Sequence, residues 1–221
     1  MPNPIPDSVE QFATVVGPDG DDIIAEMDDY ADREGFPTVG PAVGGWLELL
    51  ARMVAAERIF EFGSGYGYSA YWFSRALDSD GEIVLTEVDD DELELAREYL
   101  DRGDFDSTAH FELGDAIDTV EDYDGPFDVV LIDNEKHRYR EAFDSVREKV
   151  APGGVVLADN AVAGGTIDFE DVQALLEGED VETGEMSAGI VDYLEAVRAD
   201  PDFQTTLLPV GEGVAVSYRI E

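Results

Sequence analysis

The sequence predicts an α/β fold: a mostly parallel, twisted β-sheet with helices on both faces. Two observations predict it. Short apolar runs that suit buried strands alternate along the chain with segments of helical spacing, and the pattern TTLLPVGEGVAVSYRI closes the sequence as a hairpin. Such alternation is typical of parallel sheets, and the terminal hairpin adds one antiparallel strand. The 221 residues suit one domain of this class with a substantial core.

The N-terminal part lies outside that alternating pattern. Residues 1–20 are rich in Pro, Gly and Asp and predict a loosely held arm, which Asp21–Arg33 follows as a short amphipathic helix. We therefore expect residues 1–34 to form an arm and helix that covers the site or contacts a second copy in a homodimer. Residues 35–221 are expected to form the main domain.

The remaining elements follow in order along the chain. Glu34–Gly45 is expected to be a loop, and Trp46–Ala56 an apolar helix that packs on the sheet. The predicted strands are Arg58–Phe62, Ile83–Thr86, Ala109–Leu113, Asp128–Ile132 and Val155–Ala158. The predicted helices are Ser69–Leu77, Asp90–Leu100, about Arg138–Val150, and Gly189–Ala199. The acidic stretch Gly164–Met186 predicts a loop that acts as a lid.

The charge balance is extreme. The chain carries 53 acidic and 13 basic residues, a formal net charge of -40, yet 44% of its residues are hydrophobic, which argues against a disordered acidic tail. The acidic residues are spread along the whole length, so the surface repels itself in dilute buffer, whereas molar salt reduces the screening length to about 3 Å. We interpret the composition as that of a cytoplasmic protein from a halophile that accumulates salt.

The composition also argues against several classes of protein. No basic stripe suited to a nucleic-acid partner is visible. The sequence has no cysteine, which excludes disulfides and thiolate metal sites. The N-terminus does not have the pattern of a signal peptide, and no run approaches the roughly 20 apolar residues of a membrane span.

The stretch RIFEFGSGYGYS, Arg58–Ser69, indicates a binding site for a nucleotide-type cofactor. A short apolar run ends at Gly63, Gly65 and Gly67, and a helical pattern follows. Glycine lets the backbone adopt positive φ and lets a ligand lie directly against it, while the N-terminal amides of the helix face the turn. The dinucleotide fingerprint requires a third glycine where Tyr68 stands, which disfavours an NAD-dependent dehydrogenase. A glycine turn without a ligand is the structural alternative.

Oxygen-bearing side chains follow or end five successive strands: Glu61, Glu87, Asp115, Asp133, and the pair Asp159-Asn160. Ligands of open parallel sheets collect at the carboxyl ends of the strands. The spacing from the glycine turn to Glu87 suits a carboxylate that binds a ribose. Asp133, Asp159 and Asn160 come from neighbouring strand ends and offer hard oxygen ligands that suit Mg²⁺. Polar strand exits without a metal are the alternative.

Lys136 stands three residues after Asp133. The chain has only one other lysine, Lys149, and an acidic, salt-adapted surface disfavours lysine. An amine beside a candidate metal ligand therefore indicates a functional role, and the alternative is a surface ion pair with Glu135 or Glu141.

The segments FEFGSGYGYS, LTEVD, LGDA, LIDNEKHRY and LADN, in that order and spacing, resemble the cation-dependent O-methyltransferases, the group that contains the catechol and caffeoyl-CoA methyltransferases. The resemblance runs from about Gly35 to the C-terminus. Asp-x-x-Lys followed by Asp-Asn is its specific part, because all class I methyltransferases share the glycine turn. The chain departs from the family pattern at Asn134-Glu135, where a small-acidic pair is usual, and at Gly45, where glutamine is common.

The resemblance implies a Rossmann-like class I methyltransferase fold with a seven-stranded sheet, and S-adenosylmethionine as cofactor. The residues that match cofactor contacts are Val39, Glu61, Gly63, Gly65, Gly67, Ser69, Glu87, Asp115, Ala116 and Asp133. Glu61, the glycines and Ser69 would hold the methionine end, Glu87 the ribose, and Asp115 with Ala116 the adenine. Asp133, Asp159 and Asn160 match the metal ligands. Lys136 matches the proposed general base, and Asp133 is the second residue expected to be catalytic.

The function implied is transfer of a methyl group to a hydroxyl of a small catechol-like acceptor. A divalent cation, Mg²⁺ first of all, would lower the pKa of that hydroxyl, and Lys136 would take its proton. Two alternatives stay open: methylation of a hydroxylated tRNA base, and a protein that binds S-adenosylmethionine without catalysis.

Overall fold

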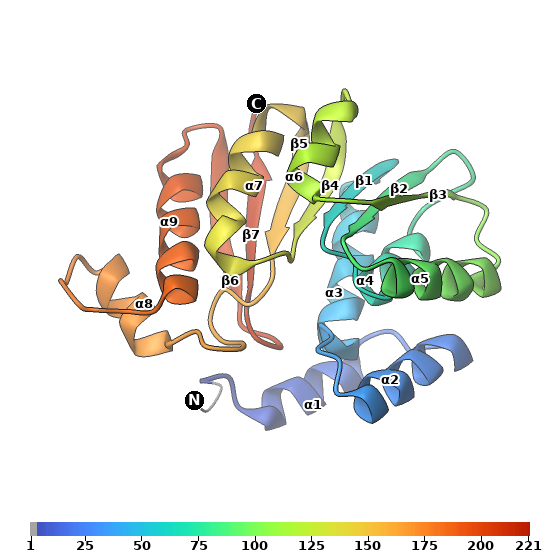
Figure 1. The fold of residues 1–221 in the computed structure, drawn as a ribbon, viewed down its shortest axis with the longest axis horizontal. Coiled ribbons are helices and arrows are strands. Elements are labelled where there is room, and N and C mark those ends of the chain that lie inside the picture. The colour runs from blue at the N-terminus through green and yellow to red at the C-terminus, as the bar shows by residue number, and fades with distance from the viewer. Residues whose placement is uncertain (1–3) are drawn as a thin grey trace.

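The computed structural model describes residues 4–221, and its centre is a seven-stranded sheet with the strand order β3-β2-β1-β4-β5-β7-β6 (Figure 1). The strands are β1 Arg58–Phe62, β2 Glu82–Glu87, β3 Thr108–Leu113, β4 Phe127–Ile132, β5 Val150–Ala158, β6 Phe203–Leu208 and β7 Val214–Arg219. The first five strands are mutually parallel, and β7 is antiparallel to both of its neighbours. The predicted fold, including the terminal hairpin, is confirmed.

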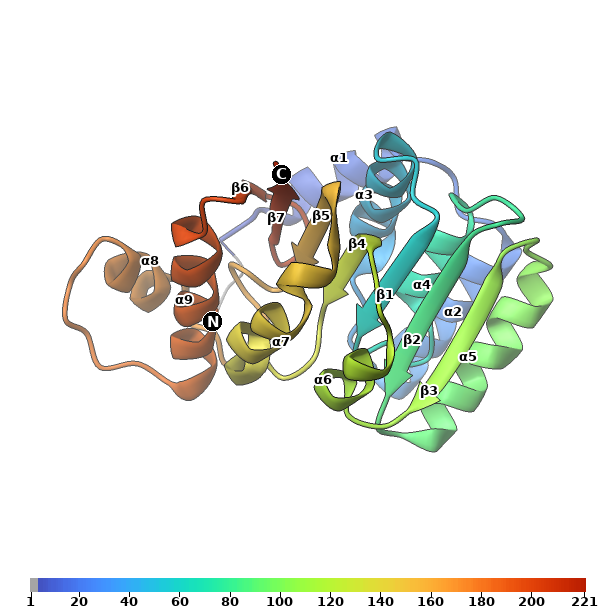
Figure 2. The ribbon, with the colours of Figure 1, turned by 90° about the horizontal axis from the view of Figure 1, so that it is seen from above.

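Helices cover both faces of the sheet and divide the core into two layers. One layer is formed by α2 Asp22–Glu34, α3 Gly40–Met53, α4 Tyr68–Ser74 and α5 Asp90–Gly103. The other is formed by α6 Ala116–Thr119, α7 Tyr139–Val146, α8 Phe169–Leu176 and α9 Glu185–Ala199 (Figure 2). The central strands β1 and β4 are almost fully buried between the layers, which is why their sequences are nearly continuous apolar runs, whereas the edge strand β3 has no buried residue.

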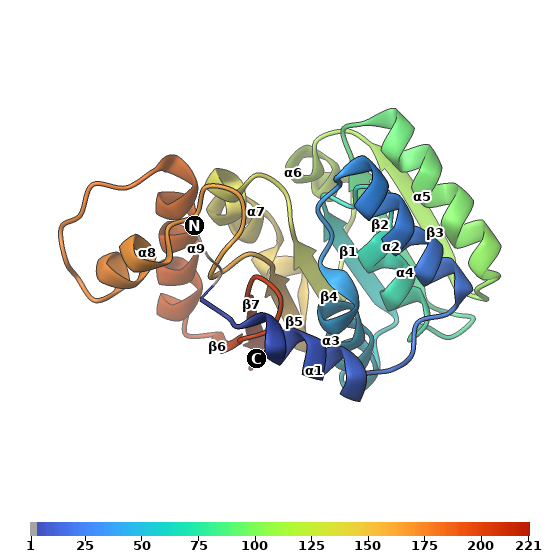
Figure 3. The same cartoon turned by 90° about the horizontal axis from the view of Figure 1, so that it is seen from below.

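The N-terminal arm is more ordered than predicted. Residues Asp7–Val16 form helix α1, which lies beside α3 on the underside of the molecule (Figure 3). No Gly or Pro interrupts this stretch, and acidic residues in its first turn suit a helix N-terminus. The prediction of a loose arm over residues 1–20 is therefore wrong for this helix, while residues 1–3 lie outside the described part.

Other boundaries also differ from the sequence-based predictions, including the start of helix α9, which lies at Glu185 and not at Gly189. Helix α3 begins at Gly40, not at Trp46, because Pro41 stands in its first turn, where proline is tolerated. Val150 opens strand β5, where it pairs with Phe127 ahead of a register shift, so the helix predicted up to Val150 ends earlier. The stretch expected to be a loop between Gly164 and Met186 contains helix α8, which is capped by the side chain of Asp168 and packs on α9.

None of the helices in residues 4–221 has the length and apolar character needed to cross a membrane.

Candidate active site

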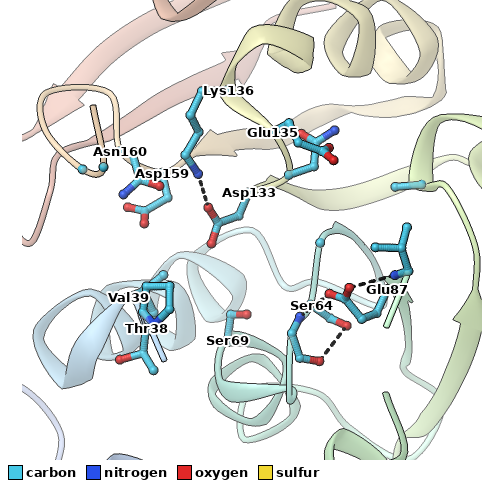
Figure 4. A pocket seen from close by; sticks show the side chains of 18 of the residues that line it. Thr38, Val39, Ser64, Ser69, Glu87, Asp133, Glu135, Lys136, Asp159 and Asn160 are labelled. Carbon is cyan, nitrogen blue, oxygen red and sulfur yellow. Dashed lines mark hydrogen bonds and ion pairs between the residues drawn. The ribbon is translucent and has the colours of Figure 1, made fainter. Parts of the chain in front are cut away.

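One cavity of about 680 Å³ opens at the carboxyl ends of β1, β2, β4 and β5. It brings together most of the residues singled out from the sequence: Val39, Gly63, Gly65, Ser69, Glu87, Asp115, Ala116, Asp133, Lys136, Asp159 and Asn160 (Figure 4). Glu61 and Gly67 do not line it. These side chains come from distant parts of the chain and meet because parallel strands end at the same edge.

The glycine turn has the backbone geometry that glycine permits and other residues avoid. Gly63, Gly65 and Gly67 have φ of 80°, 49° and 85°. A Cβ on Gly63 would lie 2.9 Å from the carbonyl oxygen of Asp133, so the turn after β1 fits closely against the end of β4. The cofactor turn and the predicted cation site are therefore in direct contact.

Gly67 is required for the close packing of helix α4 against helix α5. A Cβ there would lie 2.8 Å from the Cβ of Ala96 on α5. This glycine lets α4 start close to α5, behind the cavity wall. Its structural role is thus visible, and its predicted contact with a cofactor stays a prediction.

The carboxylate of Glu87 is held in a fixed orientation at the end of β2. It accepts hydrogen bonds from the backbone N–H groups of Gly65 at 2.8 Å, Val88 at 2.8 Å and Asp89 at 3.1 Å. The first of these links the tip of the glycine turn to the neighbouring strand. A carboxylate fixed in this way at the cavity wall suits recognition of a ribose.

Glu61 is fully buried beneath the turn. Its side chain is 0% exposed, Ser69 donates a hydrogen bond to its Oε1, and its Oε2 has no partner among the described residues. Burial raises the pKa of Glu61 to about 8, although the hydrogen bond from Ser69 acts in the opposite direction. Glu61 therefore acts on the cavity through Ser69, which does line it.

Asp115 caps the short helix α6 and forms an ion pair with Arg138, a cavity residue that the sequence analysis did not identify. Its Oδ1 accepts from the N–H of Ile117 at 2.9 Å, and its Oδ2 accepts from Arg138 at 2.5 Å. The Arg138 guanidinium holds the pKa of this carboxyl below its usual value. The scarcity argument that singled out Lys136 does not apply to Arg138, because the 13 basic residues include two lysines and therefore 11 arginines.

Asp133, Asp159 and Asn160 are neighbours, as predicted from the strand ends. Ile132 and Ala158 are paired across β4 and β5, and the N–H of Asp159 donates to the carbonyl of Ile132 at 3.2 Å. The next residues on both strands therefore emerge side by side, about 5 Å apart at the backbone. Figure 4 shows the two carboxylates and the amide directed toward the same space.

Lys136 lies over this group. Its Nζ donates to Oδ1 of Asp133 at 2.7 Å, and its side chain is 19% exposed. The aromatic ring of Tyr139 lies below the amine, with 5.1 Å between Nζ and the ring centroid. The alternative of a surface pair with Glu135 or Glu141 does not describe this geometry, since the amine is directed into the cavity.

The donor set fits a divalent cation. Burial raises the pKa of Asp133 against the effect of Lys136, and burial together with the Asp133 charge raises the pKa of Asp159. Oδ1 of Asp159 is buried without a partner among the described residues, so two crowded carboxylates share one positive charge. Within residues 4–221 no three His, Cys, Asp or Glu side chains are arranged to hold a metal, but the third ligand expected here is an amide.

Comparison with known proteins identifies the family. The sequence pattern of the O-methyltransferase family matches residues 22–220. The chain belongs to the O-methyltransferase family. It is 33% identical over 174 residues to a catechol O-methyltransferase of Niastella koreensis, with 76% of this chain and 78% of that protein covered. It is 30% identical over 169 residues to a catechol O-methyltransferase of Mycobacterium tuberculosis, covering 74% and 76% of the two chains.

Solved O-methyltransferase structures share the whole fold of this family member. The Bacillus cereus O-methyltransferase in complex with S-adenosylhomocysteine (SAH) superposes with a TM-score of 0.79 at 25% identity, covering 96% of this chain and 97% of that chain. The O-methyltransferase TomG of Streptomyces achromogenes, in complex with S-adenosylmethionine, superposes with a TM-score of 0.81 at 26% identity, covering 97% and 96%. The chain is thus an enzyme of the methyltransferase class.

Glu212 is another cavity-lining residue of this O-methyltransferase that the sequence did not reveal. It stands in the turn between β6 and β7 and accepts a hydrogen bond from Nδ2 of Asn160. The chain has 53 acidic residues, and nothing in the sequence of the terminal hairpin distinguishes Glu212 from the others as a site residue. Only the three-dimensional fold brings it to the site.

Proposed function

We propose that this chain transfers a methyl group from S-adenosylmethionine to one hydroxyl of a small aromatic acceptor with two adjacent hydroxyls, and that it requires a divalent cation, Mg²⁺ first of all. The observation that carries the proposal is the meeting of Asp133, Asp159, Asn160 and Lys136 at the rim of the same cavity that the glycine turn borders. Binding of the cofactor alone requires neither the amine nor the amide. The site therefore supports catalysis better than binding alone.

The cofactor part of the proposal rests on the glycine turn and on the family. Relatives of the same fold are known in complex with S-adenosylmethionine and SAH. In this chain Ser69 and the N–H groups of the turn would hold the methionine end, and Glu87 the ribose. Asp115 and Ala116 would border the adenine, with Val39 at the opposite wall.

The cation part rests on Asp133, Asp159 and Asn160. When bound, a divalent cation supplies a Lewis acid that favours the ionised form of an acceptor hydroxyl at neutral pH. The two carboxylates supply the charge that holds the cation, and the amide oxygen of Asn160 completes the protein ligands. Two adjacent hydroxyls on the acceptor would fix its orientation, which is where most of the acceleration of a methyl transfer arises.

Lys136 is placed to take the proton of the acceptor hydroxyl. Its Nζ lies 2.7 Å from Oδ1 of Asp133, so the amine is hydrogen-bonded to one proposed cation ligand and is not itself a ligand. Once it has lost its own proton, the amine can act as a general base. Tyr139 limits the freedom of the lysine from below, with its hydroxyl 3.4 Å from Oδ1 of Asp133 and 3.2 Å from the carbonyl oxygen of Asp159.

The charges of the cavity favour a free catechol over a coenzyme A thioester or an RNA. Its acidic lining residues are Glu87, Asp115, Asp133, Glu135, Asp159 and Glu212. Among residues 4–221, the cationic lining residues are Lys136 and Arg138, and both are already paired with carboxylates. A ligand rich in phosphates would meet repulsion without a free cation to offset it.

We also infer a homodimer, formed through the N-terminal arm. The helix α1 has no buried residue and exposes the apolar side chains of Val9, Phe12, Val15 and Val16. A second copy would cover this apolar face and extend the wall of the site. Light scattering in molar KCl should give twice the mass of the chain, and a monomer mass would contradict this inference.

Methyl transfer from labelled S-adenosylmethionine in molar KCl tests the proposed function. Catechol with Mg²⁺ should be methylated at a single hydroxyl, while catechol-containing CoA thioesters and a hydroxyuridine-containing tRNA should be methylated at least about tenfold more slowly, which corresponds to about 1.4 kcal/mol. Phenol, which lacks the second hydroxyl, is the matched control and should be a poor acceptor. Equal rates on phenol and catechol would contradict the role given to the cation.

A further inference from the structure

The turn of the terminal hairpin lies beside the end of β5, because β7 pairs with β5 in the sheet. Its backbone binds the segment after Asn160: the carbonyl of Glu212 accepts from the N–H groups of Val162 at 3.1 Å and Ala163 at 3.0 Å, and the carbonyl of Gly213 accepts from Ala161 at 2.8 Å. These bonds do not involve the side chain of Glu212. That side chain is therefore free to serve a purpose other than holding the two segments together.

The side chain of Glu212 enters the cavity and binds Asn160. One carboxylate oxygen, Oε2, accepts a hydrogen bond from Nδ2 of Asn160. An amide that donates through its nitrogen on one side presents its carbonyl oxygen on the other. The bond to Glu212 thus engages Nδ2 of Asn160 and leaves Oδ1 as the atom that is available to a cation.

The surrounding backbone is built to allow this pair. Asn160 has φ of 55°, a left-handed conformation that asparagine tolerates better than most residues. Gly164 has φ of 115°, and a Cβ there would lie 2.5 Å from Oε2 of Glu212 and 2.6 Å from Nδ2 of Asn160. Any larger residue at position 164 would press on both members of the pair.

We propose that Glu212 is a positioning residue that fixes the amide of Asn160 for cation binding in the proposed methyltransferase reaction. It touches a ligand of the cation and not the reacting atoms. Groups that orient metal ligands in this way typically change metal affinity by about 10- to 100-fold when they are removed. This inference rests on the proposed function, because it presupposes a cation at Asp133, Asp159 and Asn160.

Calorimetric titration of the full-length chain with MgCl₂ in molar KCl tests the inference. Glu212→Ala removes the acceptor and should weaken Mg²⁺ binding by about 10- to 100-fold. Glu212→Gln keeps a carbonyl oxygen that accepts from Nδ2 and should bind within about threefold of wild type. Glu182→Ala removes an exposed carboxylate outside the cavity lining and should also stay within about threefold.

The outcomes separate the two proposals. If wild type takes up no Mg²⁺, the proposed function and this inference both fall. If wild type binds Mg²⁺ and Glu212→Ala binds equally well, this inference alone falls. If Glu212→Gln loses as much affinity as Glu212→Ala, the charge of Glu212 and not its positioning of Asn160 is responsible, and the inference is again contradicted.

A second variant guards against a folding defect in Glu212→Ala. Gly164→Ala leaves Glu212 in place, but the Cβ of the new alanine would press against the side chains of Glu212 and Asn160. This variant should therefore also weaken Mg²⁺ binding, by roughly tenfold or more. Thermal unfolding of each cation-free variant shows whether the fold persists. Unchanged Mg²⁺ affinity in a folded Gly164→Ala variant would contradict the inference.

Discussion

At the scale of single residues, the site is governed by charges that have few compensating partners. Asp133 shares its charge with Lys136, whereas Oδ1 of Asp159 and Oε2 of Glu61 are buried without partners among the described residues. Burying a carboxylate without a partner is costly, so each of these groups is expected to be protonated, to bind a ligand, or to lower stability. This gives two predictions that can be tested with single substitutions.

Lys136→Ala should lower kcat for methyl transfer to catechol by about 10²- to 10⁴-fold, the usual contribution of a general base. The loss should shrink as the pH rises, because the acceptor hydroxyl then ionises without help. A pH–rate profile of the variant against wild type measures this. Lys149→Ala is the matched control, since its amine binds the carbonyl of Val120 far from the cavity lining. A pH-independent loss would contradict the role of base.

Glu61→Gln should make the stability of the ligand-free protein less dependent on pH. The pKa of Glu61 in the folded protein, about 8, lies above the ordinary carboxyl value of 4.5. Between these values the folded state holds a proton that the unfolded chain has lost, so the free energy of unfolding falls as the pH rises from about 4.5 to about 8. Asp133 and Asp159 contribute in the same direction.

Above pH 8 the Glu61→Gln variant should therefore be more stable than wild type by up to a few kcal/mol, while its amide oxygen still accepts from Ser69. Denaturant unfolding between pH 5 and 9 is the measurement. The exposed residue Glu182 offers a control, because Glu182→Gln should leave the pH dependence unchanged. Parallel profiles for Glu61→Gln and wild type would show that Glu61 is ionised without cost.

At the scale of elements, the glycine turn and the proposed cation site are coupled through the backbone. The turn after β1 contacts the end of β4 at Gly63, and Glu87 at the end of β2 holds the tip of the same turn. The end of β5 carries Asp159 and Asn160 and is bound in turn by the β6–β7 hairpin. Displacing one strand end should therefore disturb the others.

Gly63→Ala should weaken binding of both S-adenosylmethionine and Mg²⁺ and destabilise the fold by about 2–5 kcal/mol. The left-handed backbone alone costs about 1–2 kcal/mol for alanine, and overpacking against the carbonyl of Asp133 adds about 1–3 kcal/mol. Gly178→Ala is the matched control: its φ is 88°, but nothing lies within 4 Å of its Cβ. Equal losses in the two variants would mean that contact with Asp133 is unimportant.

How far the sequence predicted these elements depends on what each one buries. The central strands were predicted well because their residues are buried, and β1 lies at Arg58–Phe62 as predicted, although β5 begins at Val150 and not at Val155. Helices α1 and α8 were missed because they bury almost nothing: α1 has no buried residue, and α8 buries only Val172. Acidic composition obscured the little periodicity that they have.

The candidate site follows the same principle. Strand ends placed Asp133, Asp159 and Asn160 together because β4 and β5, which follow one another along the chain, are also neighbours in the sheet. Glu212 and Arg138 could not be linked to the site in that way, since neither residue stands at the end of a parallel strand. The burial of Glu61 behind Ser69 likewise depends on packing, which residue spacing does not encode.

At the scale of the whole molecule, the net charge is the main electrostatic influence on the stability of the folded protein. The formal charge of -40 on 221 residues creates self-repulsion that the few basic residues do not offset. Several of these basic residues are already committed to pairs, such as Arg102 with Glu26, and Arg58 with Glu82. Mobile counter-ions must supply the rest of the screening.

The thermal unfolding midpoint should therefore rise with KCl concentration. Most of the rise should occur below about 1 M, where the screening length falls from about 10 Å at 0.1 M to about 3 Å. Calorimetry across this range, with the far-UV signal monitored at the lowest salt, is the measurement. A midpoint that does not change, or that rises only beyond 1 M, would contradict screening as the cause and with it the halophilic interpretation.

The central claim, a cation held by Asp133, Asp159 and Asn160 in a methyltransferase site, is tested most directly by one kinetic titration. The initial rate of methyl transfer from S-adenosylmethionine to catechol is measured against free Mg²⁺ after the protein has been stripped with a chelator. The account predicts a negligible rate without Mg²⁺, saturation on its addition, and loss of that saturation in Asp159→Ala. Full activity in the chelated protein, or an unchanged Mg²⁺ dependence in Asp159→Ala, would contradict it.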